Sequence, residues 1–384
     1  MAANLCNGGR FGPFSQVMPR CVLLLVFLAA CTGAGPTAAS SSPTTTPPVT
    51  APPPPTQTPP GVPSRSGVLA VVTGFSGTKW EVALAGTDGA IITQATADPP
   101  IIQPNAAAPW TSTSLTRVYY LNARTGVRFL DPNGNTGSVT RIPAGDYDQS
   151  AFAVSPDDKR IAVSILSYAP PWEWTASFPK YRGMRMYVED LVGGGHHVDL
   201  FASTTVVEFP IGWTGGQLVI AVSTIACCTR VLINPYNASA YHVADPETGK
   251  RLASLCDNSA GPLGPAEPVG AVCWHDQSAP TFQRWDGSPF PAPAAVSSPY
   301  PYLVATSLDG TRVAVGGDRV RIMGGGPDDV LSESGYVYGW LDSSHIVFQR
   351  LGTSSLSVFD LQAHAGADWP IARSYWGSVP TALS

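Results

Sequence analysis

Charged side chains are scarce in this sequence, and the motifs that mark many enzymes are missing from it. Only 13% of the 384 residues are charged, and the formal net charge is −5. Nucleic-acid binding usually needs a basic face, so this balance argues against a nucleic-acid partner. We find no G-x-S-x-G elbow, no H-E-x-x-H, no phosphate-binding loop and no Rossmann fingerprint. The motifs therefore predict no reaction, and no cofactor is expected.

Long hydrophobic runs are also lacking. The apolar run Cys21–Ala30 has ten residues, whereas a membrane-spanning helix needs about 20. Residues 1–30 contain Arg10 and Arg20 but no Asp or Glu. Basic residues followed by a short apolar stretch and small residues are typical of a secretory signal peptide, so residues 1–30 are predicted to be one.

The end of this signal has a recognisable pattern. Leu28-Ala29-Ala30-Cys31, followed by Thr32-Gly33, resembles the lipobox of bacterial lipoproteins. The resemblance implies that the signal is cut before Cys31 and that the Cys31 thiol carries a diacylglyceryl group. Acyl chains hold a protein at a membrane, since each buried CH₂ contributes about 0.8 kcal/mol. We therefore expect a lipid anchor on the extracytoplasmic face of a bacterial membrane; a plain signal peptide is the alternative.

Residues 31–66 are predicted to form a disordered tether. The segment 32–66 contains eleven prolines and a single charged residue, Arg65. Such a composition buries too little apolar surface to offset the entropy of ordering. Proline keeps the chain extended at about 3.1 Å per residue, which gives a reach on the order of 100 Å. A proline-rich ligand for a partner domain is the alternative, although no basic residues flank the proline runs.

The rest of the chain, residues 67–384, contains many short runs rich in Val, Ile, Leu and Tyr, and no long segment with helical periodicity. One repeated unit is a strand, a tight polar turn and a second strand. Phe152–Val163 and Val304–Val315 are the sharpest copies, and looser copies begin at Trp110, Gly212 and Gly339. Turn aspartates such as Asp157, Asp309 and Asp342 are expected to accept backbone hydrogen bonds within their turns.

A second unit, a strand ending in an Asp-to-Gly turn, alternates with the first. Its seven copies are spaced 32 to 59 residues apart and are found at Leu84–Gly89, Arg128–Gly134, Tyr187–Gly193, His242–Gly249, Gln283–Gly287, Val320–Asp328 and Val358–Gly366. Two hairpin turns per period of about 40 residues predict a four-stranded blade. We expect an all-β domain, a β-propeller of seven four-stranded blades; six or eight blades and a pair of β-sandwiches are alternatives. Val68–Val72 should pair with a strand after Trp369 and close the ring.

The segments Ser155–Val163 and Ser307–Val315 resemble the blade motif of TolB-type, WD-like propellers. TolB-type propellers are envelope interaction proteins, so the resemblance implies a scaffold that binds an envelope protein or a cell-wall glycan. A hydrolase or lactonase with its active site at the channel mouth is the alternative. Propeller enzymes place acidic or His residues on inner strands, and the segments expected there, such as Ala153-Val154 and Ala305-Thr306, have none.

Four cysteines remain after export and after lipidation of Cys31: Cys227, Cys228, Cys256 and Cys273. An even number in an oxidising compartment indicates two disulfides. Either Cys227 and Cys228 pair with Cys256 and Cys273, or the adjacent pair forms a vicinal bridge. A Cys₄ zinc site is disfavoured because adjacent cysteines do not fit the usual ligand spacing.

The histidines give no strong metal signal. His196, His197 and Asp199 follow a run of glycines and are weak metal candidates; a solvated turn fits better, because metal sites need three or four converging ligands. His345 lies in a predicted blade turn and is expected at the surface. We predict no metal.

The segment from Tyr168 to Arg182 interrupts the third predicted blade and is unusually rich in aromatic residues. Its ligand-binding candidates are Trp172, Glu173, Trp174, Phe178, Tyr181 and Arg182. Aromatic and Arg side chains on loops of a rigid scaffold are typical of binding sites. The alternative is that these aromatics fold back over a blade edge or the channel mouth.

Overall fold

The computed structural model describes residues 64–100, 110–169, 181–223, 225–226, 230–231, 238–257, 261–262, 268–274, 279–292, 296, 304–325, 329–331, 333–369 and 374–383. Contacts divide the chain into Met1–Gln57 and Thr58–Ser384, and every described residue belongs to the second unit. The predicted signal peptide and most of the predicted tether, including Cys31, therefore lie outside the described residues. Within the described part, no helix is long and apolar enough to cross a membrane.

Regular structure in the described residues consists of β-strands. The strands of the N-terminal half are β1 (Leu69–Ser76), β2 (Lys79–Ala85), β3 (Ile91–Ala97), β4 (Thr111–Thr113), β5 (Val118–Asn122), β6 (Gly126–Leu130), β7 (Thr136–Arg141), β8 (Asp148–Val154), β9 (Arg160–Tyr168), β10 (Tyr181–Asp190), β11 (Val198–Ser203), β12 (Val207–Thr214) and β13 (Gln217–Ser223). Those that follow are β14 (Ile225–Ala226), β15 (Arg230–Val231), β16 (Ala240–Ala244), β17 (Arg251–Leu255), β18 (Gly261–Pro262), β19 (Gly270–Trp274), β20 (Thr281–Arg284), β21 (Val304–Thr306), β22 (Val313–Val315), β23 (Arg321–Met323), β24 (Asp329–Val330), β25 (Gly335–Trp340), β26 (His345–Arg350), β27 (Leu356–Asp360), β28 (Ala365–Trp369) and β29 (Ser374–Val379).

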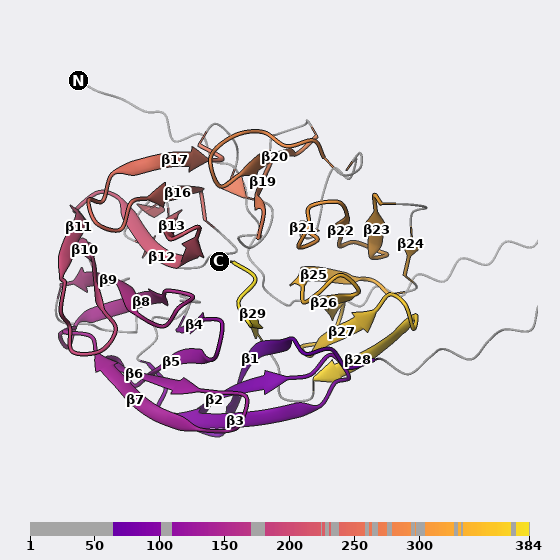
Figure 1. Cartoon of the computed structure of the whole chain (residues 1–384), viewed down its shortest axis with the longest axis horizontal. Helices are drawn as coiled ribbons and strands as arrows, with labels where there is room; N and C mark the ends of the chain where they lie inside the picture. The colour runs from indigo at the N-terminus through magenta and orange to yellow at the C-terminus, as the bar shows by residue number, and fades with distance from the viewer. Residues whose placement is uncertain are drawn as a thin grey trace, which may run out of the picture. The chain divides into compact units, whose positions relative to one another are not determined.

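All the described strands except β14 and β15, which pair as a separate two-stranded sheet, form seven antiparallel sheets that follow one another around a ring, so the domain is a seven-bladed β-propeller (Figure 1). Blades two, three, four, six and seven each have four strands, β4–β7, β8–β11, β12-β13-β16-β17, β21–β24 and β25–β28. Blade five has three described strands, β18–β20, and an isolated bridge between Gln283 and Pro289 continues its outer edge. The predicted all-β class and the seven blades are confirmed, with blade five less regular than expected.

Blade one is built from both ends of the domain. Its strand order is β29-β1-β2-β3, and Leu69 pairs with Val379 and Thr73 with Ser374. The innermost strand of this blade is therefore supplied by the C-terminal part of the chain. This confirms the predicted closure of the ring by a strand after Trp369.

The two sharpest sequence repeats make the same turn through the same hydrogen bonds. The Ser155 hydroxyl bonds to Asp157 Oδ1 (2.7 Å) and accepts the N–H of Arg160 (2.9 Å). In blade six, the Ser307 hydroxyl bonds to Asp309 (2.6 Å) and accepts the N–H of Arg312 (2.9 Å). Each turn needs one residue with positive φ, which is Asp158 (62°) in the first and Gly310 (70°) in the second.

Tryptophan side chains tie neighbouring blades together. The indole N–H of Trp213 donates to the Ala153 carbonyl (3.2 Å), and that of Trp340 donates to the Ala305 carbonyl (3.0 Å). Each bond joins the inner strand of one blade to the inner strand of the blade before it. Trp369, which is fully buried, donates to the Gly86 carbonyl (3.0 Å). Trp340 and Trp369 are therefore both part of the buried core.

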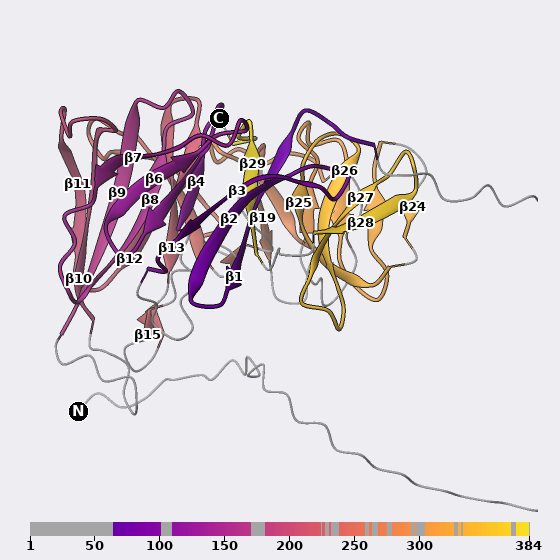
Figure 2. The ribbon, with the colours of Figure 1, turned by 90° about the horizontal axis from the view of Figure 1, so that it is seen from below.

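The chain order gives the propeller two distinct faces. We call the face with the first-to-second and third-to-fourth strand turns of each blade the turn face. The opposite face, with the second-to-third connections and the links between blades, is the insertion face. Figure 2 shows the C-terminus, which follows β29, at the turn face and β15, which belongs to the β13–β16 connection of blade four, at the insertion face.

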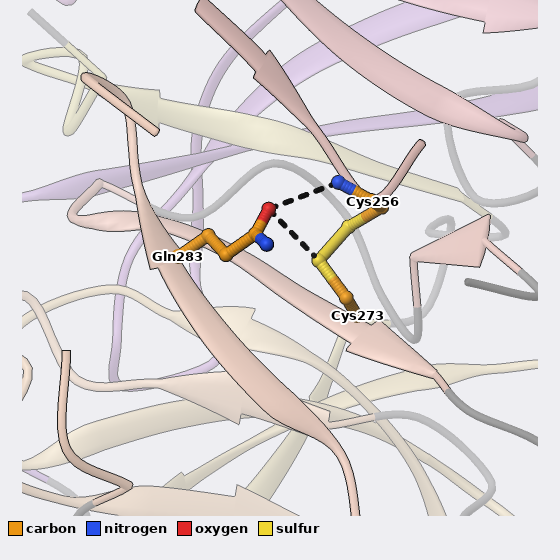
Figure 3. Close-up of a disulfide and its surroundings, with 3 residues drawn as sticks. All are labelled: Cys256, Cys273 and Gln283. Carbon is orange, nitrogen blue, oxygen red and sulfur yellow. Dashed lines mark hydrogen bonds between the residues drawn. A yellow bond between two sulfur atoms is a disulfide. The ribbon is translucent and has the colours of Figure 1, made fainter. Parts of the chain in front are cut away.

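A disulfide between Cys256 and Cys273 joins blade four to blade five. The side-chain carbonyl of Gln283 accepts the backbone N–H of Cys256 (3.0 Å) and lies 3.5 Å from Cys273 Sγ (Figure 3). The bond rules out pairing of Cys227 and Cys228 with these two cysteines. Cys227 and Cys228 lie outside the described residues, so the vicinal bridge stays a prediction.

Candidate functional site

The aromatic segment leaves and rejoins blade three at the insertion face. β9 ends at Tyr168 and β10 begins at Tyr181, so the segment connects the second and third strands of the blade, as the sequence predicted. The candidates Trp172, Glu173, Trp174 and Phe178 lie outside the described residues. Tyr181 and Arg182 are described and mark the base of the segment.

Tyr181 is held in place by its neighbours. Its hydroxyl is 3.3 Å from the Ser203 carbonyl oxygen and 3.2 Å from that of Val206, and its ring meets Tyr168 edge to face at 6.1 Å. Burial raises the pKa of Tyr181 to about 12, so the hydroxyl remains a donor at neutral pH. Through these hydrogen bonds Tyr181, the first described residue after the segment, contacts the connection between β11 of blade three and β12 of blade four.

Arg182 lines a cavity of about 590 Å³ at the same end of blade three. Arg185 and the hydroxyl residues Ser167, Ser203 and Thr204 also line it. Both arginine side chains are exposed, and no acidic residue is among those that form the cavity wall. We call this cavity the blade-three pocket.

A β-bulge sets the direction of Arg182. Tyr181 pairs with Tyr168 and Gly183 with Ser167, so Arg182 is an extra residue in β10 with no partner in β9. Side chains alternate between the two faces of a strand, and an extra residue shifts the alternation by one. Without the bulge, Arg182 would share the face of buried Met184; with it, Arg182 joins exposed Arg185.

The His196, His197 and Asp199 side chains do not converge on one point. His197 Nδ1 is 2.9 Å from Glu189 and Nε2 is 3.3 Å from Asp199, whereas His196 Nε2 is 2.6 Å from Glu247. The hydrogen bond that His197 donates to Glu189 raises the pKa of His197 above its usual value, and the bond to Asp199 adds to this. Across the described ranges, no group of three or more His, Cys, Asp or Glu side chains is arranged to hold a metal ion.

Sequence reasoning missed a second, smaller pocket between blades three and four. It has a volume of about 150 Å³ and is lined by Glu208, His242 and Arg251 together with apolar residues such as Phe201. Glu208 Oε1 is 2.9 Å from His242 Nδ1 and 2.7 Å from an Arg251 guanidinium nitrogen. Glu208 lies on the inner strand β12, where the repeat pattern gave no sign of an acidic side chain.

The last residues of the predicted tether are fixed to the turn face. Asp360 accepts hydrogen bonds from the Ser64 N–H (2.9 Å) and the Ser64 hydroxyl (2.7 Å). The Ser64 carbonyl accepts from Thr87 (2.9 Å) and lies 3.1 Å from His345 Nε2. We call Asp342, His345 and Asp360 with Ser64 the tether latch.

His345 is buried, so its expected surface position was wrong. Its side chain is 2% exposed, with Nδ1 2.9 Å from Asp342 and Nε2 3.4 Å from Asp360. The chain at Ser64 covers the turn that would otherwise expose it. Because this contact spans 281 residues, the local pattern around His345 could not predict it.

Electrostatics in the tether latch favour the charged forms. Burial opposes charge on Asp360, but hydrogen bonds from Ser64 and from the backbone of Ala363 outweigh it and lower the pKa to about 2. Burial also opposes charge on His345, yet its contact with Asp342 and the charge of Asp360 raise its pKa. The Asp342 carboxyl, bonded to His345, has a pKa well below its usual range.

Comparisons with known proteins give no family assignment. No family model matches the sequence. No curated protein matches it. Similar solved structures include BamB from Moraxella catarrhalis, with 12% identity over 73% of this chain and 78% of that chain at a TM-score of 0.34.

Two other solved structures illustrate the same low similarity. The Cps50 (Swd1) β-propeller domain of Myceliophteria thermophila is 11% identical over 77% of this chain and 98% of that chain, with a TM-score of 0.40. A functionally unknown protein from Desulfotomaculum acetoxidans is 10% identical over 81% of this chain and 98% of that chain, with a TM-score of 0.46. We take no functional argument from these similarities.

Proposed function

We propose that this protein is an extracytoplasmic lipoprotein, tethered through Cys31, whose propeller binds an envelope protein or a cell-wall glycan on its insertion face. The observation that carries the proposal is that the tether and the candidate binding residues lie on opposite faces of the propeller. The tether joins the propeller at the turn face through Ser64, and the blade-three pocket and the aromatic segment belong to the insertion face. Ser64, at the described end of the tether, therefore lies on the face opposite to the pocket.

The scaffold suits this role. Binding sites are often built from loops on a rigid framework, and here the framework is a ring closed by β29 and reinforced by the disulfide between Cys256 and Cys273. The aromatic segment leaves the insertion face beside the blade-three pocket. Aromatic side chains next to arginine are the residue types that dominate binding energy at interfaces.

The first experiment tests the anchor. Cells would produce the full chain or its Cys31→Ala variant in medium with an alkyne-labelled fatty acid. We expect label and membrane association for the wild-type chain and neither for the variant. Equal labelling of both chains, or a wild-type chain without label, would refute the lipoprotein part of the proposal.

The second experiment tests binding. The full chain, in mild detergent, would capture partners or glycans from native envelope extract after crosslinking. The test variant changes Trp172, Trp174 and Phe178 to Ala and keeps Tyr181, which packs against Tyr168. The control is Leu115→Ala, which removes an exposed apolar side chain from a turn-face hairpin.

We expect the wild type and the control to capture the same molecule and the triple variant to lose it, with all three melting alike. A molecule captured equally by all three would place the binding surface elsewhere. If the wild type captures nothing, the binding role is wrong.

A further inference from the structure

The blade-three pocket combines two cations with no acidic residue among the described residues that line it, in a chain whose net charge is negative. Arg182 and Arg185 both line the pocket, and neither forms an ion pair with any residue that the structure describes. By contrast, Arg117, Arg124 and Arg350 each face an aspartate. Arg185 has one weak contact, 3.3 Å to the Pro143 carbonyl oxygen.

Arg182 and Arg185 lie on the same face of β10 because of the β-bulge at Arg182. Gly183 makes the bulge feasible, because its φ is +157° and a Cβ there would lie 3.1 Å from the Ser203 carbonyl oxygen. Bulges often redirect a side chain next to a binding site, and this one produces a pair of neighbouring guanidinium groups.

The rest of the wall provides neutral polar groups. Ser167, Ser203, Thr204 and Thr205 have hydroxyls that donate or accept hydrogen bonds. Guanidinium groups bind carboxylate and phosphate oxygens through paired, charge-assisted hydrogen bonds. Hydroxyls suit the hydroxyls of a sugar, and the volume of about 590 Å³ is large enough for a monosaccharide unit.

We propose that the blade-three pocket binds an oxyanion, a carboxylate or a phosphate, carried by a sugar of an anionic glycan. This inference rests on the proposed binding function and names the ligand class of the same surface. Arg182 and Arg185 hold the oxyanion, and the hydroxyl residues bind the sugar ring that carries it.

The test is a binding titration with the purified full chain and four defined probes. The charged probes are oligogalacturonate and mannose 6-phosphate, and the matched neutral probes are oligogalactose and mannose. The test variant is Arg182→Gln with Arg185→Gln. The control is Arg319→Gln with Arg321→Gln, which removes the same two positive charges from exposed positions on blade six.

We expect the wild type and the control to bind at least one charged probe and to bind the neutral probes at least tenfold more weakly. The test variant should lose at least about tenfold in affinity for the charged probe, since a hydrogen bond to a charged group contributes about 1.5–3 kcal/mol. Binding of oligogalacturonate would indicate that the pocket recognises a carboxylate, and binding of mannose 6-phosphate would indicate that it recognises a phosphate. No binding of either charged probe, or equal loss in both variants, would overturn the inference.

The outcome also separates this inference from the proposed function. If the Arg182→Gln, Arg185→Gln variant still captures the envelope partner that the triple aromatic variant loses, the protein is a binding module but the pocket is not its anion site. If the wild type captures no partner, the proposed function itself fails.

Discussion

Replacing Asp360 by Asn should weaken the contact between Ser64 of the tether and the propeller, and the pKa of Asp360 gives the size of the loss in unfolding free energy. The Asp360 side chain is 1% exposed and receives two hydrogen bonds from Ser64, and one each from the backbone of Gln362 and Ala363. A carboxyl whose pKa falls from 3.8 to about 2 on folding stabilises the native state by about 2 kcal/mol at neutral pH. For a domain of this size we expect a Tm lower by about 3 °C.

The pH dependence gives this prediction a second, independent readout. The folded-state pKa of Asp360 lies below the unfolded one, so its contribution is complete above pH 3.8 and disappears as the pH falls through 2. At pH 3 roughly half of it should remain. The difference in unfolding free energy between wild type and Asp360→Asn should therefore shrink from pH 7 to pH 3 in denaturant titrations.

Asp286→Asn is the matched control. Asp286 has the same turn role in blade five, accepting the Ser288 N–H (2.8 Å), but it is exposed and contacts none of the tether residues that the structure describes. The Asp286→Asn variant should lose less stability than Asp360→Asn, because its hydrogen bonds are exposed to solvent. The reasoning about the tether latch is refuted if the two variants lose equal stability, or if the loss from Asp360→Asn is the same at pH 3 and pH 7.

Three further predictions concern single positions. Cys273→Ser should cost about 3 kcal/mol relative to the oxidised wild type, because it opens the disulfide that joins residues 17 apart; calorimetry should show a lower Tm, close to that of the reduced wild type, and a Tm unchanged from the oxidised wild type would contradict it. Gly270→Ala should cost about 3 kcal/mol, because a Cβ would lie 1.8 Å from the Gln283 carbonyl oxygen, whereas Gly67→Ala, in open space, should be nearly neutral in the same melts. The pKa of His345 is raised in the folded state, so protonated His345 contributes stability that is fully present below pH 6.5 and is lost as the pH rises through the folded-state pKa. In the His345→Gln variant, the free energy of unfolding should therefore vary less between pH 6 and pH 9 than in the wild type. An unchanged dependence on pH would exclude this role.

The sequence predicted those parts of the fold that depend on short-range contacts. The Ser155 and Ser307 turns close within five residues, so their hydrogen bonds are encoded in one stretch of sequence. The seven copies of the second unit, a strand ending in an Asp-to-Gly turn, together with these turns predicted the seven blades. Blade five was the hardest to predict, because its innermost strand β18 has two residues and its register includes the crowded Gly270.

The candidate site was predicted only in part. Residue type and position identified Tyr181 and Arg182, but Arg185 was missed because nothing local shows that a bulge brings the two arginines to one face. The burial of His345 and its contact with Ser64 join the two ends of the domain. Such contacts depend on how the ring closes, which no single segment of sequence specifies.

Ring closure has a consequence for synthesis. β1 pairs with β29, and Leu69 and Val379 are more than 300 residues apart, so blade one lacks its inner strand until almost the whole domain has emerged. Until then β1 presents an unpaired edge, the kind of edge on which chains aggregate. Contacts of such long range also slow folding. A cell that makes this protein should therefore need to keep the nascent chain unfolded, or shielded, until synthesis of the domain is nearly complete.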